Sequence, residues 1–122
     1  QGTGITICLL NNNYLGMVRQ MQELFYGKRY SATCLRRRPS CPGGCKGPND
    51  QCPEYVPDFV KLAESYGAYG IRVEKEEDTD AACAEAKKHT DAPTIIEFMI
   101  ATDELVLPMV KSGNPMSEMI LK

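Results

Sequence analysis

The sequence has no long hydrophobic run and no excess of charge of either sign. A bilayer span needs roughly 20 consecutive apolar residues, and no stretch approaches that length. No basic segment followed by an apolar one stands at the start, so we expect no signal peptide, no membrane partner and a cytoplasmic protein. The formal net charge of −2 gives no reason to expect nucleic acid as a partner. The only basic run, residues 36–38, is interpreted as a solvated loop, because no aromatic or basic stripe accompanies it.

Histidine is nearly absent as well. The single one, His89, follows a polar helical pattern, and we expect an exposed side chain near a helix end rather than a catalytic base. The length of 122 residues predicts one domain or part of one. Because an apolar strand pattern starts within a few residues of Gln1, we expect a piece of a longer protein.

One stretch organises the rest of the chain. The apolar, β-branched run at residues 5–10 is typical of a strand buried on both faces. Three asparagines, Asn11 to Asn13, follow it, and a helical pattern then begins at about Gly16 and ends near Gly27. Strand-to-helix junctions at the carboxyl edge of a parallel sheet are where α/β proteins bind phosphates and their metal ions.

The remaining pattern alternates between helices and strands. We expect helices at 58–66 and 81–89, the second capped by Asp80, and strands at 69–73 and 94–100. The tail from residue 101 is irregular until a last turn at about 116–121. This order predicts an α/β fold, a three-layer parallel sheet with helices on both faces.

Six cysteines are a high count for this length. Cys8 and Cys83 lie in a strand and a helical pattern and are expected to be buried or half-buried. The other four form a C-x6-C-x3-C-x6-C pattern within a Pro- and Gly-rich loop: Cys34, Cys41, Cys45 and Cys52. They could hold a structural zinc ion or an iron–sulfur cluster, or no metal at all, and the spacing does not decide between these. Disulfides are disfavoured in a reducing compartment.

Several blocks together resemble a known family. The block from Leu10 to Tyr30 looks like the thiamine-diphosphate domain of acetolactate synthase catalytic subunits; after the leucine it reads Asn-Asn-Asn-Tyr-Leu-Gly-Met-Val-Arg-Gln-Met-Gln-Glu-Leu-Phe-Tyr-Gly-Lys-Arg-Tyr. The resemblance continues at 57–64, 70–73, 107–110 and 117–120. It implies that residues 1–122 are the C-terminal half of such a domain, a partial thiamine-diphosphate-binding fold with a cysteine-rich insertion at about 32–56.

The resemblance also implies a cofactor site. The side chain of Asn12 and the backbone carbonyl of Tyr14 would bind Mg²⁺, which prefers hard oxygen ligands. Leu15 and Gly16 would offer backbone N–H groups to the diphosphate of thiamine diphosphate, and Met17 would lie by its thiazolium ring. Met17 and Met21 would line the substrate channel. The family commonly has Trp at the position of Met21, so we expect poor binding of sulfonylurea-type herbicides.

The implied reaction belongs to the intact enzyme. The cofactor adds to pyruvate, carbon dioxide leaves, and the product condenses with a second 2-oxo acid in branched-chain amino acid biosynthesis. The Gly-Asp-Gly half of the magnesium site, the activating glutamate and the FAD-binding domain of the family have no counterpart here. We therefore expect a segment that is inactive alone and that works, as a transferase, in a homodimer or homotetramer, with or without a regulatory subunit. Alternatives are a related 2-oxo-acid decarboxylase or oxidase, or a small four-cysteine metal-binding module.

Overall fold

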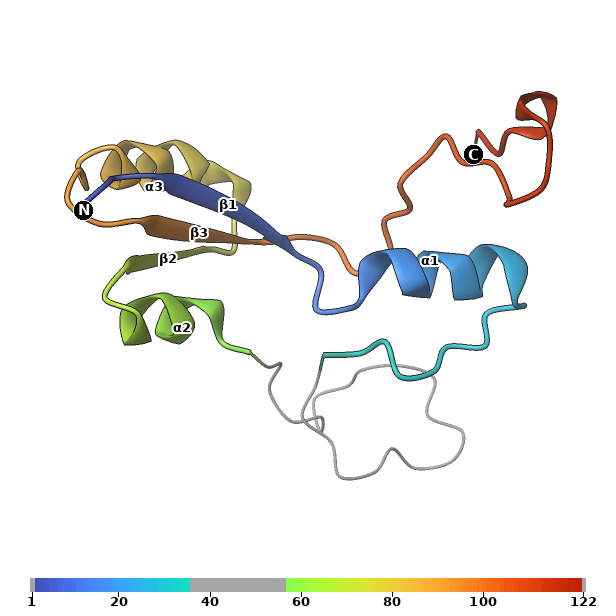
Figure 1. The fold of residues 1–122 in the computed structure, drawn as a ribbon, viewed down its shortest axis with the longest axis horizontal. Coiled ribbons are helices and arrows are strands. Elements are labelled where there is room, and N and C mark those ends of the chain that lie inside the picture. The colour runs from blue at the N-terminus through green and yellow to red at the C-terminus, as the bar shows by residue number, and fades with distance from the viewer. Residues whose placement is uncertain (1, 36–56, 122) are drawn as a thin grey trace.

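The computed structural model describes residues 2–35 and 57–121. Its centre is a parallel sheet of three strands, β1 (Thr6–Asn11), β3 (Thr94–Met99) and β2 (Tyr69–Val73), in the order β1-β3-β2. Helices lie on the two opposite faces of the sheet (Figure 1). The expected α/β fold with helices on both faces is confirmed.

Two short helices make the outer layers. α2 (Phe59–Ser65) is capped by Asp58, whose carboxylate accepts a hydrogen bond from the backbone N–H of Lys61. α3 (Thr79–Ala86) follows directly from the 3₁₀ turn η1 (Glu76–Asp78). The predicted capping of α3 by Asp80 is wrong, because η1 already leads the backbone into the helix and Asp80 falls in its first turn.

The core lies where α3 crosses the sheet. Ile96, on the central strand β3, is fully buried and packs with Val73 of β2. Ala82 and Ala86 complete this cluster from α3. Small side chains on the inner face of α3 let it approach the sheet closely, so the alanine-rich segment is a packing helix, as the sequence predicts.

The first strand differs from its prediction. β1 was expected to be buried on both faces, but Ile7 and Leu10 are exposed, and Cys8 is exposed rather than buried. β1 is an edge strand of the described sheet, and α2 and α3 pack against β2 and β3. Apart from the half-buried Leu9, its apolar side chains therefore have no covering layer among the described residues.

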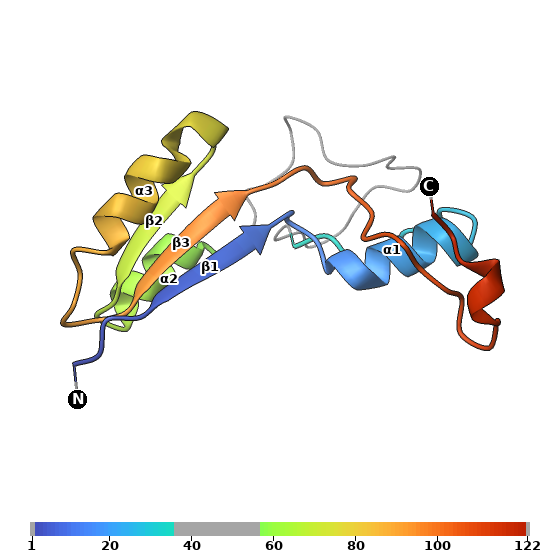
Figure 2. The same ribbon diagram turned by 90° about the horizontal axis from the view of Figure 1, so that it is seen from above.

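The first helix does not cover the sheet either. α1 (Gly16–Phe25) lies beyond the carboxyl ends of the strands, and the chain after β3 runs alongside it to the turn η2 (Met116–Glu118), as Figures 1 and 2 show. The junction between β1 and α1 therefore lies at the carboxyl edge of the sheet, as the sequence predicts. No helix within the described residues is long and apolar enough to cross a membrane.

Candidate functional site

The three asparagines after β1 have three different environments. Asn11 is the last residue of the strand and is buried. Its Nδ2 donates to Glu97 Oε1 at 2.6 Å, and its Oδ1 accepts from the backbone N–H of Asn13 at 2.8 Å. Both ends of this carboxamide are thus engaged within the sheet and the turn.

Asn12 is half-buried and points its carboxamide into the turn. Its Oδ1 accepts from the backbone N–H of Tyr14 at 3.1 Å, which leaves the second lone pair of this oxygen for another partner. Gly16 approaches the same side chain so closely that a Cβ there would lie 2.9 Å from Asn12 Nδ2. A glycine at this position therefore lets the helix start directly against Asn12.

Asn13 takes a left-handed conformation, with φ +63°, which asparagine tolerates better than most residues. Its side-chain Oδ1 is buried and has no hydrogen-bond donor among the described residues. A buried carboxamide oxygen without a donor is costly. The turn is therefore incomplete in hydrogen bonding at this oxygen and suits a cation or an additional donor nearby.

A short strap crosses the turn. Thr33 carbonyl oxygen accepts from the N–H of Leu15 at 2.8 Å, and the N–H of Leu35 donates to the carbonyl of Asn13 at 3.0 Å. Tyr14 and Cys34 form an antiparallel bridge between these bonds. The N–H of Leu15 is thus engaged by protein, so the expectation that it faces a diphosphate does not hold in this conformation.

The four-cysteine hypothesis is only partly covered by the structure. Cys34 is exposed with a free thiol, whereas Cys41, Cys45 and Cys52 lie outside the described residues. Within residues 2–35 and 57–121 no group of three or more His, Cys, Asp or Glu side chains could hold a metal ion.

An ionic network built on one buried carboxylate lies behind the turn. Glu97, on the central strand, is 1% exposed, and its Oε2 accepts from Arg72 Nε at 2.8 Å. Arg72 in turn donates through Nη2 to Asp58 Oδ1 at 2.9 Å. The hydrogen bond to Glu97 raises the pKa of the Arg72 guanidinium, and the Lys61 backbone N–H holds the pKa of the Asp58 carboxyl below its usual range. Every charged group of the network is thus paired.

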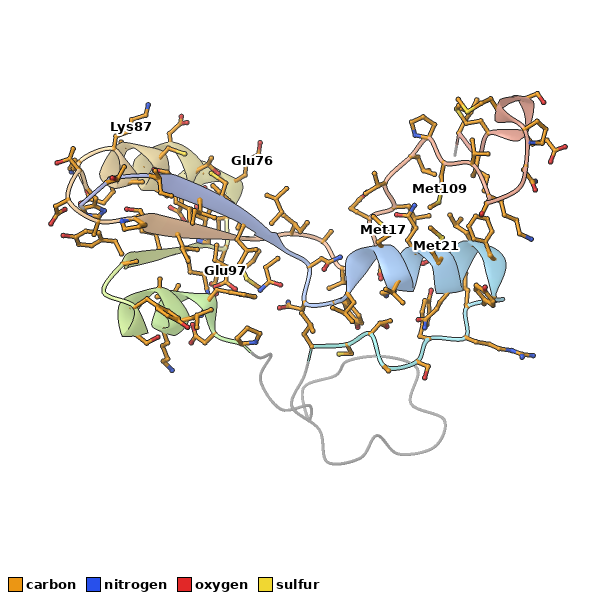
Figure 3. All side chains as sticks on the ribbon, viewed as in Figure 1. Met17, Met21, Glu76, Lys87, Glu97 and Met109 are labelled. Atoms are coloured by element: carbon orange, nitrogen blue, oxygen red, sulfur yellow. The ribbon has the colours of Figure 1, made fainter. Side chains whose placement is uncertain are left out.

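Three methionines of α1 and the tail lie near one another. Figure 3 shows Met17 and Met21 on α1 with Met109 of the tail beside them. Met17 is 74% exposed, and Met21 is half-buried. The two predicted channel residues therefore come from one helix, and the tail adds a third methionine to the same region.

Gln20 holds the tail in this place. It is buried, and its carboxamide both donates to the Val106 carbonyl at 2.9 Å and accepts from the Val106 N–H at 2.8 Å. Its Nε2 also lies 3.1 Å from the sulfur of Met109. Beside it, the Arg19 guanidinium donates to Asp103 Oδ1 at 2.6 Å.

Sequence reasoning missed Glu97, Arg72, Gln20 and Arg19. The one available signal was Glu97, an acidic residue inside an otherwise apolar strand pattern, which requires a partner when buried. The interpretation of His89 as an exposed side chain was also wrong. Its ring is half-buried, stacks on Tyr69 at 3.6 Å between centroids, and lies 3.0 Å through Nδ1 from the Thr94 hydroxyl.

Comparison with known proteins identifies the family of this chain. Residues 1–98 match the family described as thiamine pyrophosphate enzyme, C-terminal TPP binding domain. An acetolactate synthase from Mycobacterium bovis is 39% identical over 97% of this chain, and an acetolactate synthase large subunit from Corynebacterium glutamicum is 42% identical over 97%. The mitochondrial acetolactate synthase catalytic subunit of Saccharomyces cerevisiae is 38% identical over 98%. The chain spans 17%, 17% and 14% of the length of these relatives. The chain therefore belongs to the thiamine pyrophosphate enzymes, as a C-terminal TPP-binding domain similar to that of acetolactate synthases.

Proposed function

We propose that this chain is the magnesium- and diphosphate-binding part of an acetolactate synthase catalytic subunit. In the complete enzyme it would help to condense pyruvate with a second 2-oxo acid, a transferase step of branched-chain amino acid biosynthesis. The observation that carries the proposal is the turn at Asn11–Tyr14: oxygen-rich, at the carboxyl edge of a parallel sheet, in a chain matched to the TPP-binding family over residues 1–98.

The oxygens of the turn suit a hard divalent cation. Asn12 offers a half-buried carboxamide oxygen with one unused lone pair, and Tyr14 has a backbone carbonyl two residues further on. The buried Asn13 oxygen, which lacks a donor among the described residues, adds negative potential to the same turn. We assign Asn12 and Tyr14 as the magnesium ligands supplied by this chain.

The cofactor would lie against the start of α1. Gly16 and Met17 stand at the helix N-terminus, where backbone N–H groups lack partners within the helix and favour anions. Because the N–H of Leu15 already donates to Thr33, we assign the diphosphate contact to Gly16 and Met17, and only the side chain of Leu15 to the cofactor pocket. When bound, thiamine diphosphate supplies a nucleophilic carbon and stabilises the negative charge left as carbon dioxide departs.

The wider assembly is part of the same proposal. We propose that the site is completed by other domains, including one that binds FAD, in a cytoplasmic homodimer or homotetramer with or without a regulatory subunit. This segment would then be inactive alone, with Met17 and Met21 forming one wall of the channel for 2-oxo acids.

Calorimetric titration tests the proposal. Thiamine diphosphate is titrated into the full-length protein, freed of cofactor, with and without Mg²⁺. Replacing a direct metal ligand should cost more than the 10–100-fold typical of outer-shell changes. We therefore expect Asn12→Ala to weaken Mg²⁺-dependent binding more than about 100-fold. The exposed Asn114, whose carboxamide bonds only Glu118 among its described contacts, supplies the control Asn114→Ala. Unchanged binding by Asn12→Ala would refute the assignment.

The cysteine pattern remains a separate hypothesis. Cys34 is bridged by its backbone to Tyr14, so a structural zinc ion or iron–sulfur cluster on the four cysteines would connect to the proposed magnesium site. Metal analysis of reduced protein purified without oxygen tests this, and a metal content near zero would remove the idea.

A further inference from the structure

We infer that Glu97 is a positioning residue for the magnesium site: it fixes the carboxamide of Asn11, which in turn holds the backbone that presents Asn12 and Tyr14. This inference rests on the proposed function. It concerns residues on three strands that meet on one face of the sheet, the face toward α2, where Figure 3 labels Glu97.

The register of the sheet brings the network together. Glu97 pairs with Leu9 of β1 and with Arg72 of β2. Asn11 is two residues beyond Leu9 and so points to the same face. Both oxygens of the buried Glu97 are then used, Oε1 by Asn11 at 2.6 Å and Oε2 by Arg72 at 2.8 Å.

The chemistry of these bonds selects one orientation of Asn11. An ionised carboxylate can only accept hydrogen bonds, so Glu97 requires the NH₂ group of Asn11 to face it. The Oδ1 of Asn11 must then point the other way, where it accepts from the backbone N–H of Asn13 at 2.8 Å. This bond closes the turn with Asn13 in its left-handed conformation.

A single amide at position 97 cannot accept both of these hydrogen bonds. In Glu97→Gln, one end of the new side chain is a donor, and both of its neighbours, Arg72 and Asn11, already donate to it. If the new NH₂ faces Arg72, two donors meet. If it faces Asn11, Asn11 must flip and turn its own NH₂ toward the N–H of Asn13. Either arrangement loses a hydrogen bond, and the second one opens the turn.

A reciprocal exchange restores every bond. In the double variant Glu97→Gln with Asn11→Asp, the oxygen of the new amide at position 97 accepts from Arg72, and its NH₂ donates to the new carboxylate at position 11. The second oxygen of that carboxylate then accepts from the backbone N–H of Asn13. Asn11→Asp alone instead sets two carboxylates at hydrogen-bond distance, where they repel.

The experiment measures Mg²⁺ affinity rather than turnover. Mg²⁺ is titrated calorimetrically into cofactor-free full-length protein with thiamine diphosphate in excess. We expect each single variant to bind Mg²⁺ about 10–100-fold more weakly, as is typical of changes behind a metal ligand. The double variant should recover most of that loss, since the two changes compensate each other.

Asp58→Asn is the matched control. It alters the far end of the network, where Asp58 contacts Arg72, while asparagine still caps α2. We expect its Mg²⁺ affinity to stay within about twofold of the parent while its thermal unfolding temperature falls, as it would for the other variants. A merely structural role of Glu97 would instead lower both quantities in all variants alike.

The possible results distinguish the positioning role of Glu97 from the proposed function of the turn. Parental Mg²⁺ affinity in Glu97→Gln, or no recovery in the double variant, would overturn the positioning role. If Asn12→Ala weakens Mg²⁺ binding while Glu97→Gln does not, only this inference fails. If Asn12→Ala also leaves the affinity unchanged, the proposed function fails first.

Discussion

Replacing Gln20 should release the tail from α1. Gln20 holds Val106 by two hydrogen bonds, at 2.9 and 2.8 Å, in the manner of a paired strand. Leucine is close in volume and helix propensity, so Gln20→Leu should keep α1 intact. Val106 is 79% exposed, so water replaces the lost partners, and each bond is worth only about 1 kcal/mol. The sum, about 2 kcal/mol, corresponds to an opening equilibrium about 30-fold more favourable.

Amide hydrogen exchange measures this opening directly. The Val106 N–H of the full-length protein should exchange about 30-fold faster in Gln20→Leu, while amides of β3 should keep their rates. Gln22→Leu is the control, because the Gln22 carboxamide bonds Ser31 rather than the tail. Equal Val106 exchange in the parent and Gln20→Leu would show that the tail is held by other contacts, such as the Arg19–Asp103 ion pair.

Three further predictions concern the core, the pH dependence and the channel. Ile96→Ala should destabilise the protein by about 3 kcal/mol in urea unfolding, because Ile96 is fully buried and leaves a cavity beneath α3; a loss under about 1 kcal/mol would mean that the site collapses. The lowered pKa of Asp58 means that its stabilising contribution is present above the unfolded value of 3.8 and is lost as pH falls through the folded pKa. Asp58→Asn should therefore be less stable than the parent at neutral pH, with the difference disappearing in acid; a constant difference would contradict this. Met21→Trp should raise sulfonylurea sensitivity about tenfold in an inhibition assay, because the indole ring adds stacking contacts. Ordinary sensitivity of the parent would contradict the expectation that Met21 weakens herbicide binding.

Local patterns predicted the secondary structure well. The strand at 69–73 is reproduced at both ends, and Asp58 caps α2 because its side chain, backbone and first turn are neighbours in the sequence. The burial of β1 was not predictable in the same way. An apolar run reports how buried a strand is in its complete surroundings, and the described sheet leaves β1 at an edge.

Side-chain partners across the sheet were the part that sequence reasoning could not reach. Asn11 and Glu97 are 86 residues apart, as are Gln20 and Val106. Alternation of strands and helices predicts that their segments share one edge, but not which side chains meet there. That requires the register, and a shift of one residue would turn Glu97 to the opposite face.

The register also places the three asparagines in different environments, so they have different roles although their side chains are identical. Asn11 is the last residue of β1, and its side chain lies on the same face of the sheet as Glu97. Both ends of its carboxamide therefore form hydrogen bonds, one with Glu97 and one with the Asn13 backbone. Asn13 supplies the left-handed residue of the turn. Only Asn12 combines partial exposure with an oxygen that retains a free lone pair, held in place by the N–H of Tyr14. This hydrogen bonding fits the proposal that Asn12 is the magnesium ligand, as the resemblance to acetolactate synthases implies.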